Sequence, residues 1–166
     1  MSTTGTRIPL DHARRLAQSL TDCIDGESHV VGSIRRRKPD VGDIEILVHA
    51  DAAVEIPVGC GTLMPDEYQT VRGGKRDWKY WRIVHTRQRF TVDLFRFDDD
   101  NRGSIMLIRT GPADFSRCFV VALKRRRLRH EGGYIRDKTG TIISCPNEKF
   151  AFALAGMSWL EPEDRL

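Results

Sequence analysis

Long apolar runs, paired cysteines and a biased composition are all missing from this sequence of 166 residues. No uncharged apolar run approaches the ~20 residues that a membrane-spanning helix needs, which excludes a membrane protein. The four cysteines, at positions 23, 60, 118 and 145, have no CxxC spacing, so we expect reduced thiols rather than a disulfide framework or a zinc site. With 14 glycines and 7 prolines, a collagen-like or low-complexity chain is also excluded.

The amino terminus lacks the apolar segment of a secretory signal, which together with the reduced cysteines predicts a cytoplasmic protein. The length fits one domain or two small lobes. There are 27 basic and 23 acidic residues, and the formal net charge is +4. The basic residues cluster at 35–38 and 124–130. Such clusters are typical of a polyanion-binding surface, although a solvated helix or loop has the same composition.

The periodicity of apolar residues predicts an α+β protein. A helix begins at Pro9 and continues to a stop at Gly26, and alternating strands cover 43–48 and 90–97. A polar break follows, and we place the boundary between two lobes there, giving 1–102 and 103–166. In the second lobe we expect a strand over 105–108, a helix after 110–112 that Gly132-Gly133 closes and a small hairpin over 137–140. A last helix over 147–155 should be capped by Asn147 and stopped by Gly156.

Three carboxylates carry the functional argument. Asp43 and Glu45 project from the same face of one predicted strand, and Asp93 projects from a second strand. If the strands are neighbours, the three acids converge and need a counter-charge. Mg²⁺ takes carboxylate oxygens and keeps positions open for phosphate, and two such ions would clamp both oxygens of an in-line displacement. The alternative is an ordinary exposed strand face with acids two residues apart.

A phosphate-binding element precedes these acids. Gly32-Ser33 ends a predicted strand, which lets backbone N–H groups and the Ser33 hydroxyl approach a triphosphate. Arg36 follows and can meet phosphate with a two-pronged donor geometry. The loop therefore predicts a nucleoside triphosphate as the ligand, because transfer from a triphosphate depends on positioning and charge neutralisation.

The segment VVGSIRRRKPDVGDIEILV resembles the nucleotidyltransferase signature, in particular the palm of family X DNA polymerases, the DNA polymerase beta family. Further segments resemble the same family in the same order, namely RIPLDHARRLAQSLTDCID, TVDLF, RTGPADF and NEKFAFALAGMSWLEPEDR. The resemblance covers about residues 8–166. It implies a nucleotidyltransferase palm, a mixed sheet backed by helices over 1–102, and a small α+β lobe over 103–166 that contacts nucleotide and DNA.

The resemblance also implies roles for individual residues. Asp43 and Glu45 would bind two Mg²⁺ ions, with Mn²⁺ as a possible substitute, and Asp93 would hold the ion at the primer 3′-hydroxyl and help accept its proton. Gly32, Ser33 and Arg36 would bind the β- and γ-phosphates. Gly111 would lie under the sugar of the nucleotide.

Several positions depart from the family pattern. The second acid is Glu45 where the family often has Asp, and Pro112 follows Gly111 where the family has Ser. Ile108-Arg109 stands where an aromatic pair commonly contributes to sugar selection. Only a short tail precedes the palm helix, so the chain resembles a minimal member without the family's lyase and helix-hairpin-helix lobes.

Two further groups of residues have competing interpretations. Lys124, Arg125 and Arg127 are expected to contact the DNA backbone, although cations also stabilise a helix C-terminus. The aromatic residues Trp78, Tyr80 and Trp81 could stack on bases, but alternate aromatics of a strand more often pack in the core. Glu148 and Arg165 are expected to form a structural ion pair.

These observations predict a metal-dependent DNA nucleotidyltransferase that adds deoxynucleotides to a primer 3′-hydroxyl and releases pyrophosphate, in templated gap filling during repair or replication of a small genome. Its partners would be gapped or primer–template DNA and deoxynucleoside triphosphates, with no membrane. Template-independent addition to DNA or RNA ends is an alternative. A non-catalytic module that binds DNA ends or nucleotides is another.

Overall fold

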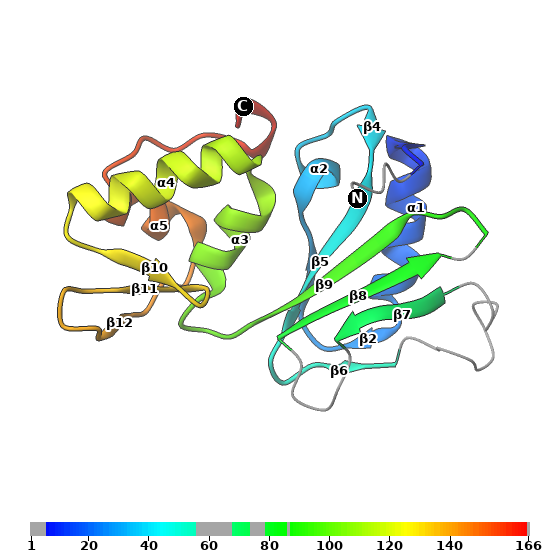
Figure 1. Ribbon diagram of the computed structural model, residues 1–166, viewed down its shortest axis with the longest axis horizontal. Coiled ribbons are helices and arrows are strands. Elements are labelled where there is room, and N and C mark those ends of the chain that lie inside the picture. Colours follow the sequence, from blue (N-terminus) through cyan, green and yellow to red (C-terminus); the bar gives the residue numbers. More distant parts are fainter. Residues whose placement is uncertain (1–5, 56–67, 74–78, 86, 166) are drawn as a thin grey trace. The chain divides into compact units, whose positions relative to one another are not determined.

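The computed structural model describes residues 6–55, 68–73, 79–85 and 87–165 (Figure 1). The chain divides into two compact units, Met1–Arg96 and Phe97–Leu166. This division lies ahead of the predicted boundary between residues 102 and 103. The polar turn after residue 97 belongs to the second unit, because the carboxylate of Asp98 accepts a hydrogen bond from the hydroxyl of Tyr134.

The first unit is built on a five-stranded sheet with the order β3-β5-β9-β8-β7. Neighbouring strands β3 and β5, β7 and β8, and β8 and β9 are antiparallel. The strands are β3 (Ser28–Val30), β5 (Asp43–His49), β7 (Tyr68–Gly73), β8 (Tyr80–His85) and β9 (Thr91–Phe97). Two short antiparallel pairs flank it, β1 (Ile8–Pro9) with β4 (Asp40–Val41) and β2 (Ile24–Asp25) with β6 (Ala53–Val54).

Helix α1 (Leu10–Thr21) covers one face of this sheet (Figure 1). Its buried residues, Ala13, Ala17 and Leu20, share a core with the apolar side of β5. Ile44, Ile46 and Val48 are fully buried there, as the alternation along β5 predicts. Asp43 and Glu45 therefore face the opposite side of the sheet. The predicted α+β class, with a mixed sheet backed by helices, is confirmed.

Helix α1 is shorter than the sequence pattern predicts. It ends at Thr21 rather than at Gly26, because Ile24 pairs with Val54 in the two-stranded β2–β6 sheet. Gly26 instead allows a tight turn towards β3, with a φ of +128° that suits glycine and a close approach to Ala52. Pairing with a distant strand has overridden the local helical periodicity.

The second unit contains three helices and a small three-stranded antiparallel sheet with the order β10-β11-β12 (Figure 1). The helices are α3 (Arg102–Thr110), α4 (Ala113–Arg125) and α5 (Glu148–Ala155), followed by the 3-10 helix η1 (Pro162–Asp164). The strands are β10 (Arg129–Glu131), β11 (Tyr134–Arg136) and β12 (Ile142–Ile143). The predicted helix over 147–155 and the hairpin over 137–140 are confirmed.

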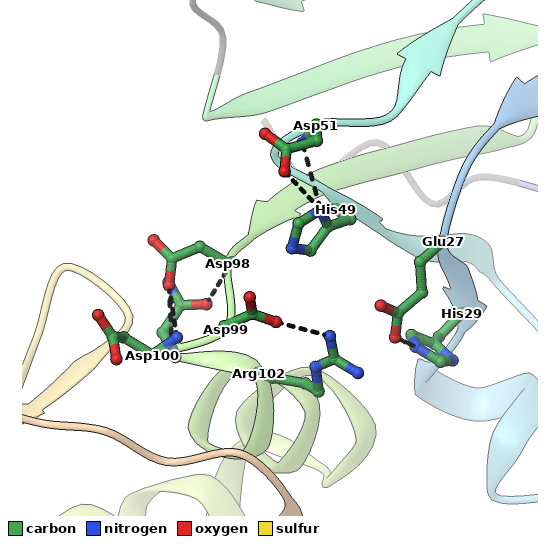
Figure 2. Close-up of polar contacts among 9 residues, drawn as sticks. Glu27, His29, His49, Asp51, Asp98, Asp99, Asp100 and Arg102 are labelled. Carbon is green, nitrogen blue, oxygen red and sulfur yellow. Dashed lines mark hydrogen bonds and ion pairs between the residues drawn. The ribbon is translucent and has the colours of Figure 1, made fainter.

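The strand predicted over 105–108 is wrong, since these residues lie in α3. The turn before α3 explains the difference. The carboxylate of Asp98 accepts hydrogen bonds from the backbone N–H groups of Asp100 and Asn101, and the Asn101 side chain accepts one from Asp98 in return (Figure 2). This closed polar turn starts a helix despite the β-branched residues that follow.

The predicted end of α4 is also wrong. The helix ends at Arg125, and Gly132-Gly133 forms the turn between β10 and β11. Helix α5 has the expected caps, because the Asn147 side chain accepts a hydrogen bond from the backbone N–H of Phe150 and Gly156 adopts the left-handed conformation.

The glycines and prolines over 57–68 predict an irregular connection, and Gly73-Gly74 predicts a hairpin turn. Residues 57–67, Gly74 and Trp78 lie outside the described residues. Cys23, Cys118 and Cys145 are free thiols, and Cys60 is not described. Among the described residues, no helix is both long enough and apolar enough to cross a membrane.

Candidate active site

Asp43 and Asp93 come from neighbouring strands of the sheet, β5 and β9. The pKa of Asp43 is raised, first by burial and then by the negative charge of Asp93. The nearby charges of Arg82, Arg36 and Arg7 oppose this rise. The two predicted acids therefore lie close enough to repel each other, on the side of the sheet away from α1.

Asp93 is held by side chains of β8. Arg82 lies directly opposite it in the β8–β9 register. The guanidinium donates from Nε to Oδ1 and from Nη2 to Oδ2, each at 2.6 Å. The Tyr80 hydroxyl also donates to Oδ1, at 2.9 Å. The Asp93 side chain is only 5% exposed, so both of its oxygens are fixed in a buried network.

Tyr80 belongs to the same network. Burial, followed by the hydrogen bond to Asp93, raises the pKa of Tyr80 to about 12. The phenol therefore stays protonated and remains a hydrogen-bond donor at neutral pH. Its ring packs against Phe95, with the ring centroids 5.1 Å apart. Trp81, on the opposite face, is buried and donates from its indole N–H to the hydroxyl of Thr70 at 3.1 Å. Tyr80 and Trp81 thus pack within the fold, which favours the structural interpretation for both.

Glu45 lies against Gly32. A Cβ atom placed on Gly32 would be 2.2 Å from Oε2 of Glu45, and the φ of Gly32 is +65°. The backbone N–H of Val31 donates to the Glu45 carbonyl oxygen at 2.9 Å, which fixes the approach. Gly32 begins a single helical turn, α2 (Gly32–Arg35), instead of ending a strand as predicted. Glycine is required here both for its conformation and for the space that the carboxylate takes.

A pocket of about 1300 Å³ in the first unit is lined by Ser33, Arg36 and Asp43 together. The Ser33 hydroxyl oxygen is buried and has no hydrogen-bond partner among the described residues. Such an atom is expected where a ligand completes the hydrogen bonding. The basic side chains that line the pocket are Arg7, Arg36, Lys38, Arg82 and Arg89.

Sequence reasoning missed three of these cations, Arg7, Arg82 and Arg89. Arg7 stands just before β1, and only the fold brings it to the pocket. Arg82 alternates with apolar residues along β8, which marks it as a side chain on the face of the sheet opposite Ile83. Its partner on β9 becomes visible only when the register is known.

No group of three His, Cys, Asp or Glu side chains in the described part of the chain is arranged to hold a metal ion. The donor chemistry nevertheless suits a hard cation, because Asp43 and Asp93 repel each other where a positive charge would stabilise both. The histidines make local contacts instead. His29 bonds to Glu27 at 2.7 Å, and His49 accepts a hydrogen bond from the backbone N–H of Asp51 (Figure 2).

The remaining predicted site residues belong to the second unit. Gly111 follows α3, and a Cβ atom there would be 2.5 Å from the ring of Phe115, so packing within this unit already requires glycine. Lys124 and Arg125 form the exposed last turn of α4. Arg127 is exposed and has a left-handed φ of +61°. Their roles towards nucleotide and DNA stay predictions.

No protein-family model and no curated protein sequence matches this chain. The fold is similar to that of a solved structure, Leishmania infantum polymerase beta in a ternary P/T complex. The TM-score is 0.74 and the sequence identity is 15%, over 98% of this chain and 78% of that one. The chain therefore has a polymerase beta-like fold, as the resemblance of its segments predicted.

Proposed function

We propose that this protein is a metal-dependent DNA nucleotidyltransferase that extends a primer 3′-hydroxyl from a deoxynucleoside triphosphate and releases pyrophosphate, in templated gap filling. One observation carries the proposal. Asp43, which Asp93 repels, lines a basic pocket that also holds the unpartnered hydroxyl of Ser33. Acids beside a polycationic pocket are the arrangement that transfer from a triphosphate needs.

The three predicted acids, Asp43, Glu45 and Asp93, would hold two Mg²⁺ ions, or Mn²⁺ in their place. Bound Mg²⁺ supplies charge neutralisation at the phosphates and lowers the pKa of the attacking hydroxyl. In Asp93, Oδ1 accepts two hydrogen bonds and Oδ2 accepts one, so Oδ2 retains one lone pair, which would be available to the cation at the 3′-hydroxyl.

The basic pocket would bind the triphosphate. Ser33 offers its hydroxyl, and Arg36 and Arg7 offer guanidinium groups that neutralise the phosphate charge. Gly32 would let the backbone of α2 approach the ligand closely, because it carries no side chain. Gly111 would lie under the sugar, and Lys124, Arg125 and Arg127 would contact the DNA backbone from the second unit.

A primer-extension assay on gapped, nicked and single-stranded DNA tests the proposal, with each deoxynucleotide and one ribonucleotide supplied separately. We expect Mg²⁺-dependent incorporation opposite the complementary template base. Asp43→Asn and Asp93→Asn should reduce incorporation by ~10³-fold or more, because each removes a charge that the transition state needs. Asp51→Asn is the matched control, since Asp51 is exposed on the same unit and does not line the pocket.

The outcomes separate the candidate functions. Extension that ignores the template base would indicate a template-independent transferase. Nucleotide binding without pyrophosphate release would indicate a non-catalytic module. Equal incorporation by Asp43→Asn and wild type would contradict the assignment of the site itself.

A further inference from the structure

The ion pair between Arg82 and Asp93 is not explained by the proposed function alone. A carboxylate that serves as a cation ligand needs oxygen lone pairs that point to the ion. Here the guanidinium of Arg82 covers both oxygens of Asp93, and the hydroxyl of Tyr80 covers Oδ1 a second time. An ionised carboxylate has about four lone-pair positions, and this network leaves one, on Oδ2.

The two partners differ in exposure. The Asp93 side chain is 5% exposed, whereas the Arg82 side chain is 40% exposed and lines the basic pocket. Asp93 is thus the buried, fixed member of the pair, and the positive charge lies on the side of the pocket. The charge of Arg82 also acts on Asp43, whose pKa it lowers. One guanidinium therefore influences both acids of the candidate site.

We propose that Arg82 is a positioning residue that acts as the built-in counter-ion of Asp93, fixing the carboxylate for catalysis while competing with a divalent cation for it. This inference rests on the proposed function, because it concerns the same two acids. Arg82 repels the incoming cation electrostatically. Arg82 also holds the free Oδ2 lone pair of Asp93 in one fixed direction.

The proposal predicts opposite changes in two measurements. Without the charge of Arg82, a divalent cation meets less repulsion and finds more free lone pairs on Asp93, so its affinity rises. Without the two-pronged contact, the Asp93 carboxylate rotates more freely, so turnover falls. A residue that only stabilises the fold would lower both, since partial unfolding removes binding and activity together.

The experiment titrates Mn²⁺ alone into the full chain and follows free Mn²⁺ by electron paramagnetic resonance, with primer extension measured in parallel. We expect Arg82→Gln to bind Mn²⁺ about tenfold more tightly than wild type, equivalent to ~1.4 kcal/mol. Its kcat should fall by on the order of tenfold to a hundredfold, as expected when a reacting group is misplaced. The nucleotide KM should change less than kcat, because Arg82 holds the acid rather than the nucleotide.

Arg72→Gln is the matched control. Arg72 lies opposite Arg82 on the other neighbouring strand, β7, is exposed, and does not line the pocket. It removes the same charge from the same sheet, and its guanidinium carbon lies 5.9 Å from the centroid of the Tyr80 ring rather than on Asp93 itself. We expect its Mn²⁺ affinity to stay within about twofold of wild type, because exposed charges at longer range are screened.

Arg82→Lys separates charge from geometry and serves if Arg82→Gln does not fold, which circular dichroism will show. Lysine keeps the charge but loses the two-pronged contact. Its Mn²⁺ affinity should stay within about threefold of wild type, while its kcat falls. Unchanged kcat in Arg82→Lys, or equal Mn²⁺ affinity in Arg82→Gln and Arg72→Gln, would overturn the inference. If wild type binds no Mn²⁺, the metal-dependent function fails instead.

Discussion

The carboxylate of Glu45 occupies the space where any other residue at position 32 would place its side chain, because a Cβ atom on Gly32 would lie 2.2 Å from Oε2. Gly32 also has a left-handed φ of +65°. The two residues are joined through the backbone, where the N–H of Val31 donates to the carbonyl of Glu45. The candidate acid and the candidate phosphate loop are therefore built as one structural element.

Substitution of Gly32 by Ala tests this coupling. We expect the free energy of unfolding to fall by ~1–3 kcal/mol, because alanine strains the backbone at this position. The Glu45 carboxylate should also move, so nucleotide incorporation should fall even where the variant remains folded. Gly132→Ala is the control, because Gly132 has a similar left-handed φ of +62° but a Cβ atom there meets nothing within 4 Å. Urea unfolding and primer extension check both effects. Equal losses of stability in the two variants would show that the Glu45 carboxylate does not restrict the side chain at position 32.

Ser33 gives a prediction in which stability and binding separate. Its hydroxyl oxygen is buried without a hydrogen-bond partner among the described residues, so Ser33→Ala removes an unsatisfied polar atom. We expect the free energy of unfolding to stay the same or to rise by up to ~1 kcal/mol. The KM for the nucleotide should increase several-fold, because the hydroxyl is the proposed phosphate donor. Loss of stability in Ser33→Ala would mean that the hydroxyl already has a partner in the folded protein.

Much of the fold was predictable because its local signals agree with its tertiary contacts. The alternation in β5 places Ile44, Ile46 and Val48 in the core, as predicted. The cap of α5 at Asn147 and its end at Gly156 were also correct. In each case a single residue type satisfies a local requirement, such as a side-chain oxygen for a free N–H group, and no distant contact opposes it.

The remaining features depend on pairing between distant residues. Residues 105–108 are rich in β-branched and long apolar side chains, yet they lie in helix α3, whose Gly103 packs against the backbone of the distant Asn147. Arg82 could not be recognised as the partner of Asp93, because the register of β8 and β9 is set by the whole hairpin. The neighbouring positions of Asp43 and Asp93 were thus predictable, but the hydrogen-bonded network around Asp93 was not.

The predicted ion pair between Glu148 and Arg165 is confirmed and fully buried. Arg165 Nη1 donates to Glu148 Oε1 at 2.6 Å, and Nε and Nη2 donate to the Leu160 carbonyl oxygen at 3.2 Å and 3.1 Å. The guanidinium also lies within 5.2 Å of the ring centroids of Phe152 and Trp159. This cluster ties the carboxyl-terminal segment to α5.

Removal of one member of this pair should be costly. We expect Arg165→Met to lower the free energy of unfolding by ~3–5 kcal/mol, because Glu148 is left buried without its counter-charge. The double variant Glu148→Gln with Arg165→Met should recover part of the loss, since it removes the uncompensated charge. Urea unfolding followed by circular dichroism measures both. A double variant that is less stable than Arg165→Met would contradict the electrostatic explanation.

His130 predicts a pH dependence of stability for the second unit. Burial, followed by the charge of Arg109, lowers the pKa of His130 below its usual 6.5, and a hydrogen bond with the Gly133 backbone opposes the shift only in part. Above pH 6.5 the imidazole is neutral in both the folded and the unfolded chain. As the pH falls through this value, the unfolded chain binds a proton that the folded chain does not. Stability is therefore lost on acidification, until the lowered folded pKa is passed.

His130→Gln isolates this contribution, because glutamine retains hydrogen-bonding groups but does not titrate. We expect the free energy of unfolding of wild type to fall more steeply than that of the variant between about pH 7.5 and about pH 5. Urea unfolding at a series of pH values, with circular dichroism as the signal, gives the two slopes. Parallel slopes would mean that His130 binds its proton equally well in the folded protein, despite its burial beside Arg109. A shallower variant slope would instead identify this histidine as a group that destabilises the second unit in acid.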